Sequence, residues 1–265
     1  MYEFHTDLDN YFLMQKMVCE EYIIPFIEKI YPFNNEANVL EIGCGTAGVI
    51  SAFLERGNMG FGIDLNADSL DYAREKLSGF IESKHLTLLN DDIYSVDFEA
   101  EYQVKFDVII LKDVIEHLSD HEKLLKKMKS FLAPSGVIFL GFPPWQMPFG
   151  GHQQISRSKF LSRLPYFHLL PMSLYKWVFK LFKEESKHFC EIKENGISIE
   201  RFEKLAKKTE YSIMNRDFYF VNPIYKYKFK MKERKQSTFI SSIPYIRNFF
   251  TTCAFYLICI NTSTK

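Results

Sequence analysis

The residues best suited to carry chemistry lie in a glycine-rich turn, VLEIGCGTAG, at positions 39–48. Its glycines, Gly43, Gly45 and Gly48, have the G-x-G-x-x-G spacing that lets a nucleotide approach the backbone closely. Asp64 ends the apolar segment that follows, and its two carboxylate oxygens suit the paired hydroxyls of a ribose. The turn and the acid predict a site for an adenosine-containing ligand, without choosing between a dinucleotide and another adenosine derivative.

Two acidic features near this turn favour a cationic ligand over a pyrophosphate. Glu41 lies two residues before the first glycine and places a carboxylate beside the turn. Because the start of a helix recruits anions, this charge opposes a pyrophosphate but not a ligand with sulfonium and ammonium groups. The segment NDDI places Asp91 and Asp92 where a strand should end, and either acid suits an adenine amino group.

The segments VLEIGCGTAG, GIDLN, NDDI and FDVIILKDVIEHL resemble, in order and spacing, the class I S-adenosylmethionine-dependent methyltransferases. The most similar branch is the small-molecule, ubiquinone-biosynthesis-like type. The resemblance covers residues 38–142 firmly and 198–262 loosely. It implies S-adenosylmethionine as the cofactor, and transfer of its methyl group to an oxygen, less readily to a nitrogen or carbon, of a small or lipid-linked acceptor.

The resemblance also implies a role for each cofactor-binding residue. Asp64 holds the ribose hydroxyls, Leu65 packs on the adenine, and the backbone carbonyl of Leu111 meets the cofactor's amino group. Asp92 binds the adenine amino group, although the sequence leaves Asp91 as an alternative. The full implied set is Glu41, Gly43, Cys44, Gly45, Asp64, Leu65, Asp92, Ile93 and Leu111.

Two histidines, His152 and His117, are the candidates for proton transfer. His152 lies in GFPPWQMPFGGHQQ, which leaves the fifth predicted strand at the end where this fold places the methyl acceptor. The pair Gly150-Gly151 permits a sharp turn that would aim His152 and Gln153 into an apolar-rimmed pocket. We expect His152 to act as the general base.

His117 also belongs to a group that includes Glu116 and His121. Glu116 and His117 could form an acid/base pair beside the substrate. The HxxxH spacing places the imidazoles of His117 and His121 on one helical face, an arrangement found in metal sites. Because the sequence indicates no third ligand, it predicts no metal site.

Alternating strand-like and helix-like segments carry these motifs. Apolar runs rich in β-branched and aromatic residues predict buried parallel strands at 38–42, 59–64, 85–89, 106–111 and 137–142. Helical patterns are predicted between them at 47–56, 67–77 and 121–132, and further on a helix at 198–208 precedes antiparallel edge strands at 211–221 and 251–260. The pattern predicts a doubly wound α/β fold with a mostly parallel, seven-stranded, Rossmann-like sheet.

The whole chain, 1–265, is predicted to form a single methyltransferase domain. Its parts are an N-terminal helical cover (1–37, helical over 9–30 with an interruption at Pro25), a cofactor-binding core (38–142), an inserted substrate cap (143–197) and a C-terminal helix with edge strands (198–265). In the cap, SLYKWVFKLFK places four apolar side chains on one helical face, namely Leu174, Trp177, Val178 and Leu181. That face fits a lid over the substrate or weak peripheral contact with an anionic membrane.

The charge distribution is uneven although the formal net charge is zero. Residues 1–140 contain 24 acidic and 12 basic side chains, and the remainder contains 9 acidic and 21 basic ones. The split fits an anionic acceptor facing the second half, or mutual neutralisation of the two halves in the fold. The lysines of KYKFKMK, at 226–232, could contact phosphates, but they match no nucleic-acid-binding motif, and no nucleic acid partner is expected.

Cysteine usage and the termini predict a soluble, cytoplasmic protein. The five cysteines have neither metal-ligand nor disulfide-framework spacing, which favours a reducing compartment. The polar N-terminus is no signal peptide, and the longest apolar run, 249–260, is too short to span a bilayer. Two alternatives stay open: an NAD-dependent oxidoreductase, and a non-catalytic binding module of the same fold. The sequence leaves the oligomeric state open.

Overall fold

The computed structural model describes residues 7–261, so the first six residues of the predicted N-terminal cover and residues 262–265 lie outside it. The strands are β1 (Asn38–Ile42), β2 (Met59–Asp64), β3 (Leu86–Asn90), β4 (Phe106–Lys112), β5 (Leu132–Phe142), β6 (Tyr211–Val221), β7 (Arg234–Lys235) and β8 (Cys253–Ile260). The helices of the first half are α1 (Leu8–Val18), α2 (Ile24–Glu28), α3 (Gly48–Leu54), α4 (Ala67–Lys76), α5 (Ser78–Glu82), α6 (Phe98–Tyr102) and α7 (His121–Lys129). The later helices are α8 (Met172–Leu181), α9 (Lys187–Asn195), α10 (Ile199–Lys208), α11 (Tyr225–Phe229), α12 (Thr238–Ser241) and α13 (Ile246–Phe249). A π-helical turn η2 (Cys19–Ile23) joins α1 to α2, and 3-10 turns occur at η3 (Ile115–His117), η4 (Gln153–Ile155), η5 (Leu161–Arg163) and η6 (Phe167–Leu169).

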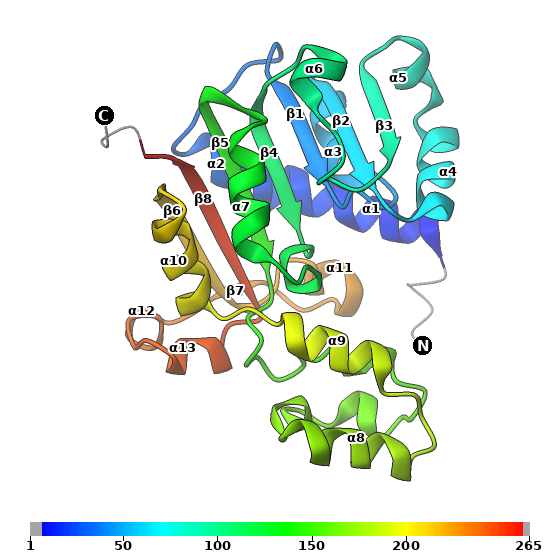
Figure 1. The fold of residues 1–265 in the computed structure, drawn as a ribbon, viewed down its shortest axis with the longest axis vertical. Helices are drawn as coiled ribbons and strands as arrows, with labels where there is room; N and C mark the ends of the chain where they lie inside the picture. Colours follow the sequence, from blue (N-terminus) through cyan, green and yellow to red (C-terminus); the bar gives the residue numbers. More distant parts are fainter. Residues whose placement is uncertain (1–6, 262–265) are drawn as a thin grey trace.

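The strands form one sheet in the order β3-β2-β1-β4-β5-β8-β6-β7. The first five pair in parallel, while β8 is antiparallel to both β5 and β6 (Figure 1). The doubly wound, mostly parallel sheet is therefore confirmed, with eight strands rather than seven. The additional strand, β7, is only the pair Arg234–Lys235 at the edge of β6, which is too short to give a period-two pattern.

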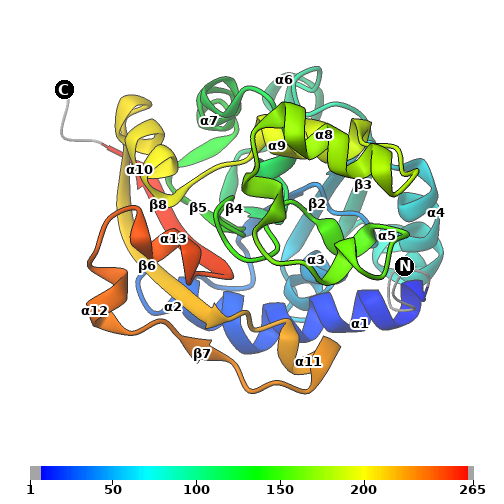
Figure 2. The same ribbon diagram turned by 90° about the horizontal axis from the view of Figure 1, so that it is seen from below.

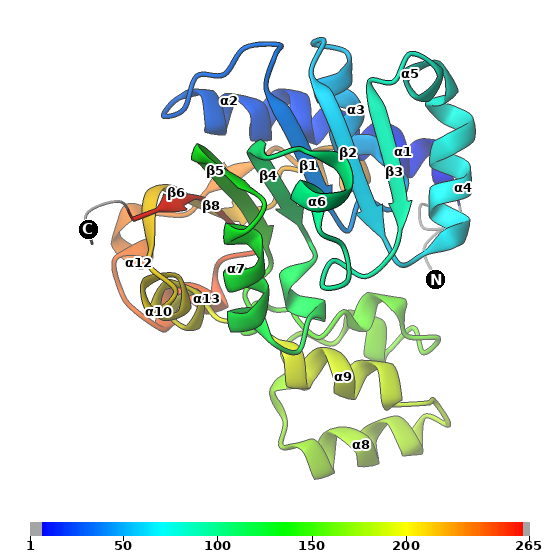
Figure 3. The same ribbon diagram turned by 45° about the horizontal axis from the view of Figure 1, so that its top comes forward.

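Helices cover both faces of the sheet, which explains the continuous apolar strand sequences. In β4, Ile109 and Leu111 pack into one core, and Val108 and Ile110 pack into the core on the opposite face. Figure 3 shows α6 and α7 on the first face and α1 and α2 on the second. The carboxyl ends of the parallel strands all lie along the same edge of the sheet.

The start of β5 differs from the sequence-based expectation. The sequence predicts a helix as far as residue 132 and a strand only from residue 137, but β5 already begins at Leu132, which pairs with Phe106. The register then shifts, so that the next pair is Val137 with Val108. The four intervening residues, Ala133-Pro134-Ser135-Gly136, bulge out of the ladder, where a proline without an N–H group is tolerated.

The N-terminal cover is helical throughout residues 8–28. Pro25 does not interrupt it, because this proline lies in the first turn of α2, directly after the π-helical turn, where its missing N–H is not needed. The cover packs tightly on the core: a Cβ atom on Gly48 would lie 2.4 Å from the carbonyl oxygen of Phe12. Helix α1 thus contacts the start of α3, the helix that follows the glycine-rich turn.

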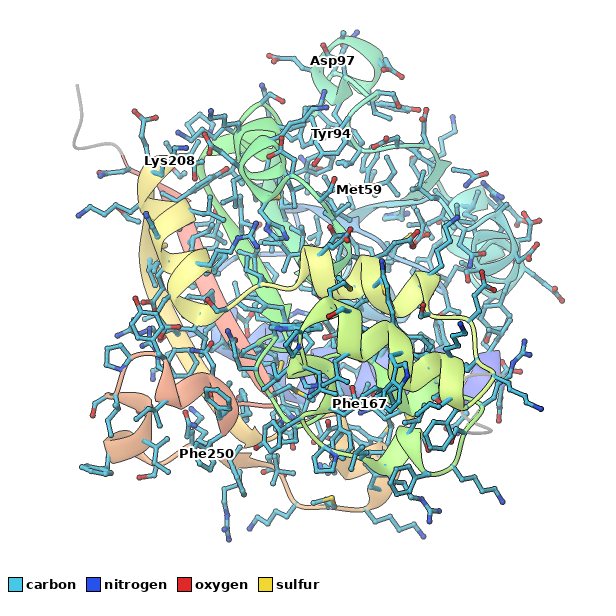
Figure 4. All side chains as sticks on the ribbon, turned by 60° about the horizontal axis from the view of Figure 1, so that its bottom comes forward. Met59, Tyr94, Asp97, Phe167, Lys208 and Phe250 are labelled. Atoms are coloured by element: carbon cyan, nitrogen blue, oxygen red, sulfur yellow. The ribbon has the colours of Figure 1, made fainter. Side chains whose placement is uncertain are left out.

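The cap, residues 143–197, has a small core of its own. Its buried members are Leu161, Phe167, Tyr175, Phe179, Phe189 and Cys190. Helices α8 and α9 lie beyond the carboxyl ends of the parallel strands (Figure 1), and Phe167 lies on the face that Figure 4 turns toward the viewer. Figure 2 shows α11 beside α1 on the same side of the molecule.

The buried face of α8 differs from the predicted apolar face. Tyr175 and Phe179, spaced by one helical turn, are fully buried, whereas Leu174, Trp177 and Leu181 are 42%, 53% and 58% exposed. The rings of Tyr175 and Phe179 pack instead into the core of the cap, where aromatic side chains bury a large apolar surface. Most of the predicted face therefore points to solvent.

Other expectations concerned membranes and thiols. Across residues 7–261, no helix has both the length and the apolar character needed to cross a membrane. All five cysteines are free thiols, and four of them are buried.

Candidate functional site

Two adjoining cavities open at the carboxyl ends of the parallel strands. The first, of about 290 Å³, lies between the ends of β1, β2, β3 and β4. The second, of about 320 Å³, lies between the cap, α1 and α11. Asp113 and His117 line both cavities. A ligand in one cavity therefore lies next to a ligand in the other.

The first cavity collects residues from the predicted cofactor motifs. Of the implied set, it is lined by Gly43, Asp64, Leu65, Asp92 and Ile93. The side chain of Leu65 is 72% exposed, so its apolar surface is accessible to a ligand in this cavity. The remaining members, Glu41, Cys44, Gly45 and Leu111, do not line this cavity.

The glycine-rich turn is tied to the end of β2. The N–H groups of Gly43 and Cys44 both donate to the carbonyl of Ile63, at 2.8 and 3.2 Å, and the N–H of Gly45 donates to the Asp64 carboxylate at 2.7 Å. Gly43 and Gly45 have φ of +71° and +50°, which L side chains rarely adopt. The turn thus fixes the Asp64 carboxylate at the mouth of the cavity.

Glu41 braces the helix behind the turn. It is 4% exposed, and its carboxylate accepts a hydrogen bond of 2.9 Å from the N–H of Ile50 in α3. Burial raises the pKa of Glu41 to about 8, against the opposing effect of that hydrogen bond and of Lys112. Glu41 lines neither cavity, and its carboxyl group contacts the backbone of α3 instead.

Asp91 and Asp92 both line the first cavity, but their carboxylates accept hydrogen bonds from different donors. One carboxylate oxygen of Asp91 accepts from the N–H of Asp92 at 2.7 Å and from the hydroxyl of Ser95 at 2.6 Å. The Ser95 hydrogen bond lowers the pKa of Asp91. Asp92 accepts from the N–H of Tyr94 at 3.0 Å through its Oδ1 atom. Asp91 therefore stabilises the turn that presents Asp92.

The second cavity has an apolar wall and a charged end. Pro143, Met147 and Phe149 supply part of the wall, as the predicted apolar rim requires. Trp145 lies elsewhere, because its ring packs edge-on against His168. The lining residues that the sequence analysis did not single out include Tyr11, Gln15, Asp113, Asn222, Tyr225 and Thr252.

His152 lines the second cavity as predicted, but the local geometry differs. The left-handed residue is His152 itself, with φ of +52°. Gly150 and Gly151 are needed for close packing, since added Cβ atoms would lie 2.2 Å from the carbonyl oxygen of Trp145 and 2.4 Å from the Cβ of His168. The placement predicted for Gln153 is wrong: it is fully buried, and its amide donates to carbonyls of the cap.

His117 and His152 face each other across the junction, with ring centroids 5.0 Å apart. Burial lowers the pKa of both, and the neighbouring His117 helps to bring the pKa of His152 to about 4. Both imidazoles are therefore neutral near pH 7. His121 lies apart, since it begins α7 while His117 ends the 3-10 turn η3, and its Nε2 is 2.9 Å from the carbonyl of Ile115. The prediction of two imidazoles on one helical face is wrong.

Three charged side chains set the potential at the junction. Asp113 has φ of +56° and pairs with the buried Lys112 at 2.5 Å. Lys228 of α11 reaches the second cavity, and burial together with the charge of Lys112 lowers its pKa to about 8. The KYKFKMK segment therefore supplies a lysine to the cavity rather than only a solvated face.

The sheet and its two cavities together identify the class of protein. A glycine-rich turn after β1, an acid at the end of β2, acids after β3 and a capped second cavity on a sheet with antiparallel β8 together define a Rossmann-like methyltransferase fold. Residues 40–138 match the family model described as a methyltransferase domain.

Relatives with known names agree with this class. The chain is 31% identical over 106 residues to a ubiquinone biosynthesis O-methyltransferase of Glaesserella parasuis, a match that covers 38% of this chain and 43% of the relative. The chain thus spans less than half the length of that relative. The predicted resemblance to S-adenosylmethionine-dependent methyltransferases is confirmed.

Solved structures support the same fold. An S-adenosylmethionine-dependent methyltransferase from Clostridium acetobutylicum has a TM-score of 0.54 at 14% identity, covering 98% of this chain and 96% of that one. A geranyl diphosphate C-methyltransferase from Streptomyces coelicolor, in complex with Mg²⁺, geranyl diphosphate and S-adenosyl-L-homocysteine, has a TM-score of 0.53 at 13% identity, covering 89% and 77%. Both similarities concern the fold.

Proposed function

We propose that this protein is an S-adenosylmethionine-dependent methyltransferase that methylates an oxygen of a small or lipid-linked acceptor carrying an anionic group. The observation that carries the proposal is the pair of adjoining cavities that share Asp113 and His117. One cavity is lined by the cofactor motifs and the other by the cap. Methyl transfer requires such an arrangement, because the donor carbon and the acceptor atom must lie in line and in contact.

The first cavity supports the cofactor assignment residue by residue. The ribose hydroxyls would be held by the Asp64 carboxylate, whose Oδ2 atom already orients the glycine-rich turn. The adenine would pack between Leu65 and Ile93, with its amino group on Asp92. We assign that contact to Asp92 rather than Asp91, because Asp91 already accepts two hydrogen bonds within the turn.

The second cavity supports an apolar acceptor with a negative group. Its wall includes Met147, Phe149 and Phe229, while Lys228 provides a positive charge from α11. The similar fold of a methyltransferase named for geranyl diphosphate, an apolar chain with an anionic head, is consistent with this chemistry. Among the acceptor atoms, the named O-methyltransferase relatives favour oxygen.

Catalysis would come mainly from positioning the reactants and excluding water, which can contribute roughly 7–11 kcal/mol. The acceptor oxygen would attack the methyl carbon while the carbon–sulfur bond breaks toward sulfur. His152, neutral near pH 7 and beside the junction, would accept the hydroxyl proton. With its pKa depressed to about 4, it is a weak base and adds a smaller contribution.

Calorimetry with purified protein tests the cofactor assignment. We expect S-adenosylmethionine to bind with micromolar affinity, and Asp64→Ala to weaken binding about tenfold or more, or about 1.4 kcal/mol, because the ribose hydroxyls lose their acceptors. Asp68→Ala, at an exposed acid in the first turn of α4, is the matched control and should change nothing. Tighter binding of NAD than of S-adenosylmethionine would contradict the assignment.

The exposed apolar face of α8 supports weak peripheral contact with an anionic membrane. Trp177 and Leu181 are more than half exposed, and Lys176 and Lys180 lie on the same helix. We expect sedimentation with anionic but not neutral liposomes, reversed by high salt, and weaker for Trp177→Ala. Met214→Ala, at an exposed apolar residue of β6, should sediment like the wild type. Equal sedimentation of all proteins with neutral liposomes would exclude this contact.

A further inference from the structure

A mixed cluster of ligand-type side chains lies where the two cavities meet. Glu116, His117 and His152 each offer one ligand atom, and these atoms all lie within 4.8 Å of one another. Glu116 and His117 belong to η3, directly after β4, and His152 follows the neighbouring strand β5. Because carboxyl ends of parallel strands meet at one sheet edge, the fold brings together residues that are far apart in the sequence.

Among the three side chains, Glu116 is unusual because its carboxyl group is buried without a hydrogen-bond donor from any other described residue. It is 3% exposed, and within residues 7–261 neither of its carboxylate oxygens accepts a hydrogen bond from another residue. Burying a carboxyl group without donors costs free energy unless a partner or a metal satisfies its oxygens. The side chain nevertheless lines the second cavity beside two imidazoles.

We propose that Glu116, His117 and His152 bind one divalent transition-metal ion of the Zn²⁺ type. Two imidazoles and one carboxylate are a ligand set of catalytic zinc sites, which keep a further position open for water or substrate. Nitrogen donors favour such an ion over Mg²⁺ and Ca²⁺, which prefer oxygen ligands. All three residues line the second cavity, so the open position faces the acceptor.

This inference rests on the proposed methyl transfer and specifies its acceptor as a hydroxyl group. A hydroxyl oxygen bound to the metal gives its proton to water more readily, because the metal lowers its pKa. The resulting oxygen anion forms the O–C bond to the methyl group, and the C–S bond breaks with its electron pair on sulfur, leaving neutral S-adenosylhomocysteine. His152 then acts as a metal ligand, and this role replaces proton acceptance by its imidazole.

Metal binding by the full-length, chelator-treated protein tests the inference directly. We expect Zn²⁺ titration to show one saturable site, and Co²⁺ to give visible absorption without thiolate charge-transfer bands, which excludes the free cysteines as ligands. Glu116→Gln and His152→Asn should each weaken binding about tenfold or more. The control His85→Asn, at an exposed histidine before β3, should bind like the wild type. Circular dichroism checks that each variant is folded.

The possible outcomes separate this inference from the proposed function. Absence of a saturable site, or equal affinity in Glu116→Gln, His152→Asn and wild type, overturns the metal site. In that case binding of S-adenosylmethionine by the same samples still tests the cofactor assignment. Loss of metal in both variants, with S-adenosylmethionine affinity unchanged within about twofold, supports a metal that serves the acceptor rather than the cofactor.

Discussion

Gly45→Val is expected to abolish measurable binding of S-adenosylmethionine while the protein remains folded. Gly45 has φ of +50°, a conformation in which a β-branched residue is strained, at a cost of roughly 1–2 kcal/mol. The added side chain would also point toward the Asp64 carboxylate, which lies 4.0 Å from the Cβ position. Because that carboxylate lines the first cavity, the added methyl groups would crowd the place expected for the ribose hydroxyls. We expect affinity to fall at least about 100-fold, or about 2.7 kcal/mol, in calorimetric titration.

The control for this variant is a glycine with neither constraint. Gly79, in the short helix α5, has open space at its Cβ position and no positive φ, so Gly79→Ala should bind the cofactor like the wild type. Thermal melting of all three proteins separates lost binding from lost folding. Retained affinity of Gly45→Val at an unchanged melting temperature would show that this turn is not the cofactor site.

The second large effect concerns the pH dependence of stability. Burial raises the pKa of Glu41 from 4.5 to about 8 in the folded protein. Because the folded-state pKa lies above the unfolded value, the contribution of Glu41 to the free energy of unfolding is fully present below pH 4.5. It is lost as the pH rises through 8. Relative to Glu41→Gln, the wild type should therefore lose roughly 3–4 kcal/mol of unfolding free energy between pH 5 and pH 8.

Urea unfolding of both proteins without cofactor, at several pH values, measures this difference. Glutamine keeps an acceptor for the Ile50 N–H and cannot ionise, so titration of the histidines cancels in the comparison. Lys112 and Asp64, the charged groups that act on Glu41, are present in both proteins. Parallel pH profiles would show that the carboxyl group is charged throughout, stabilised by more than the contacts described.

The core of the fold could be predicted because its signals are local. Strands β1 and β2 occur at the predicted residues, because short apolar runs bounded by polar residues indicate strands that are buried on both faces of the sheet. Asn66 and Ser198 cap α4 and α10 through their side chains, as their position before each helix indicates. The cofactor motifs follow the ends of these strands directly, so their convergence follows from the parallel topology.

Only the part of the second cavity around His152 could be predicted, because separate elements build the rest of it through tertiary packing. Tyr11 comes from the N-terminal cover, Lys228 from α11 and His152 from the cap. No pattern in the sequence predicts that α11 lies beside α1. For the wall formed by α11, the lysine-rich segment around Lys228 was the available signal. The HxxxH spacing pointed to His121 instead of the residue that does meet His117, His152.

The central claim is that one cavity holds the cofactor and the other the methyl acceptor, with the junction at His117 between them. A crystal structure with S-adenosylhomocysteine is the most direct measurement. We expect the adenine beside Leu65 and Asp92, the ribose hydroxyls on Asp64, and the sulfur directed toward His117 and the second cavity. A ligand bound outside the first cavity, or with its sulfur directed away from His117, would contradict the account.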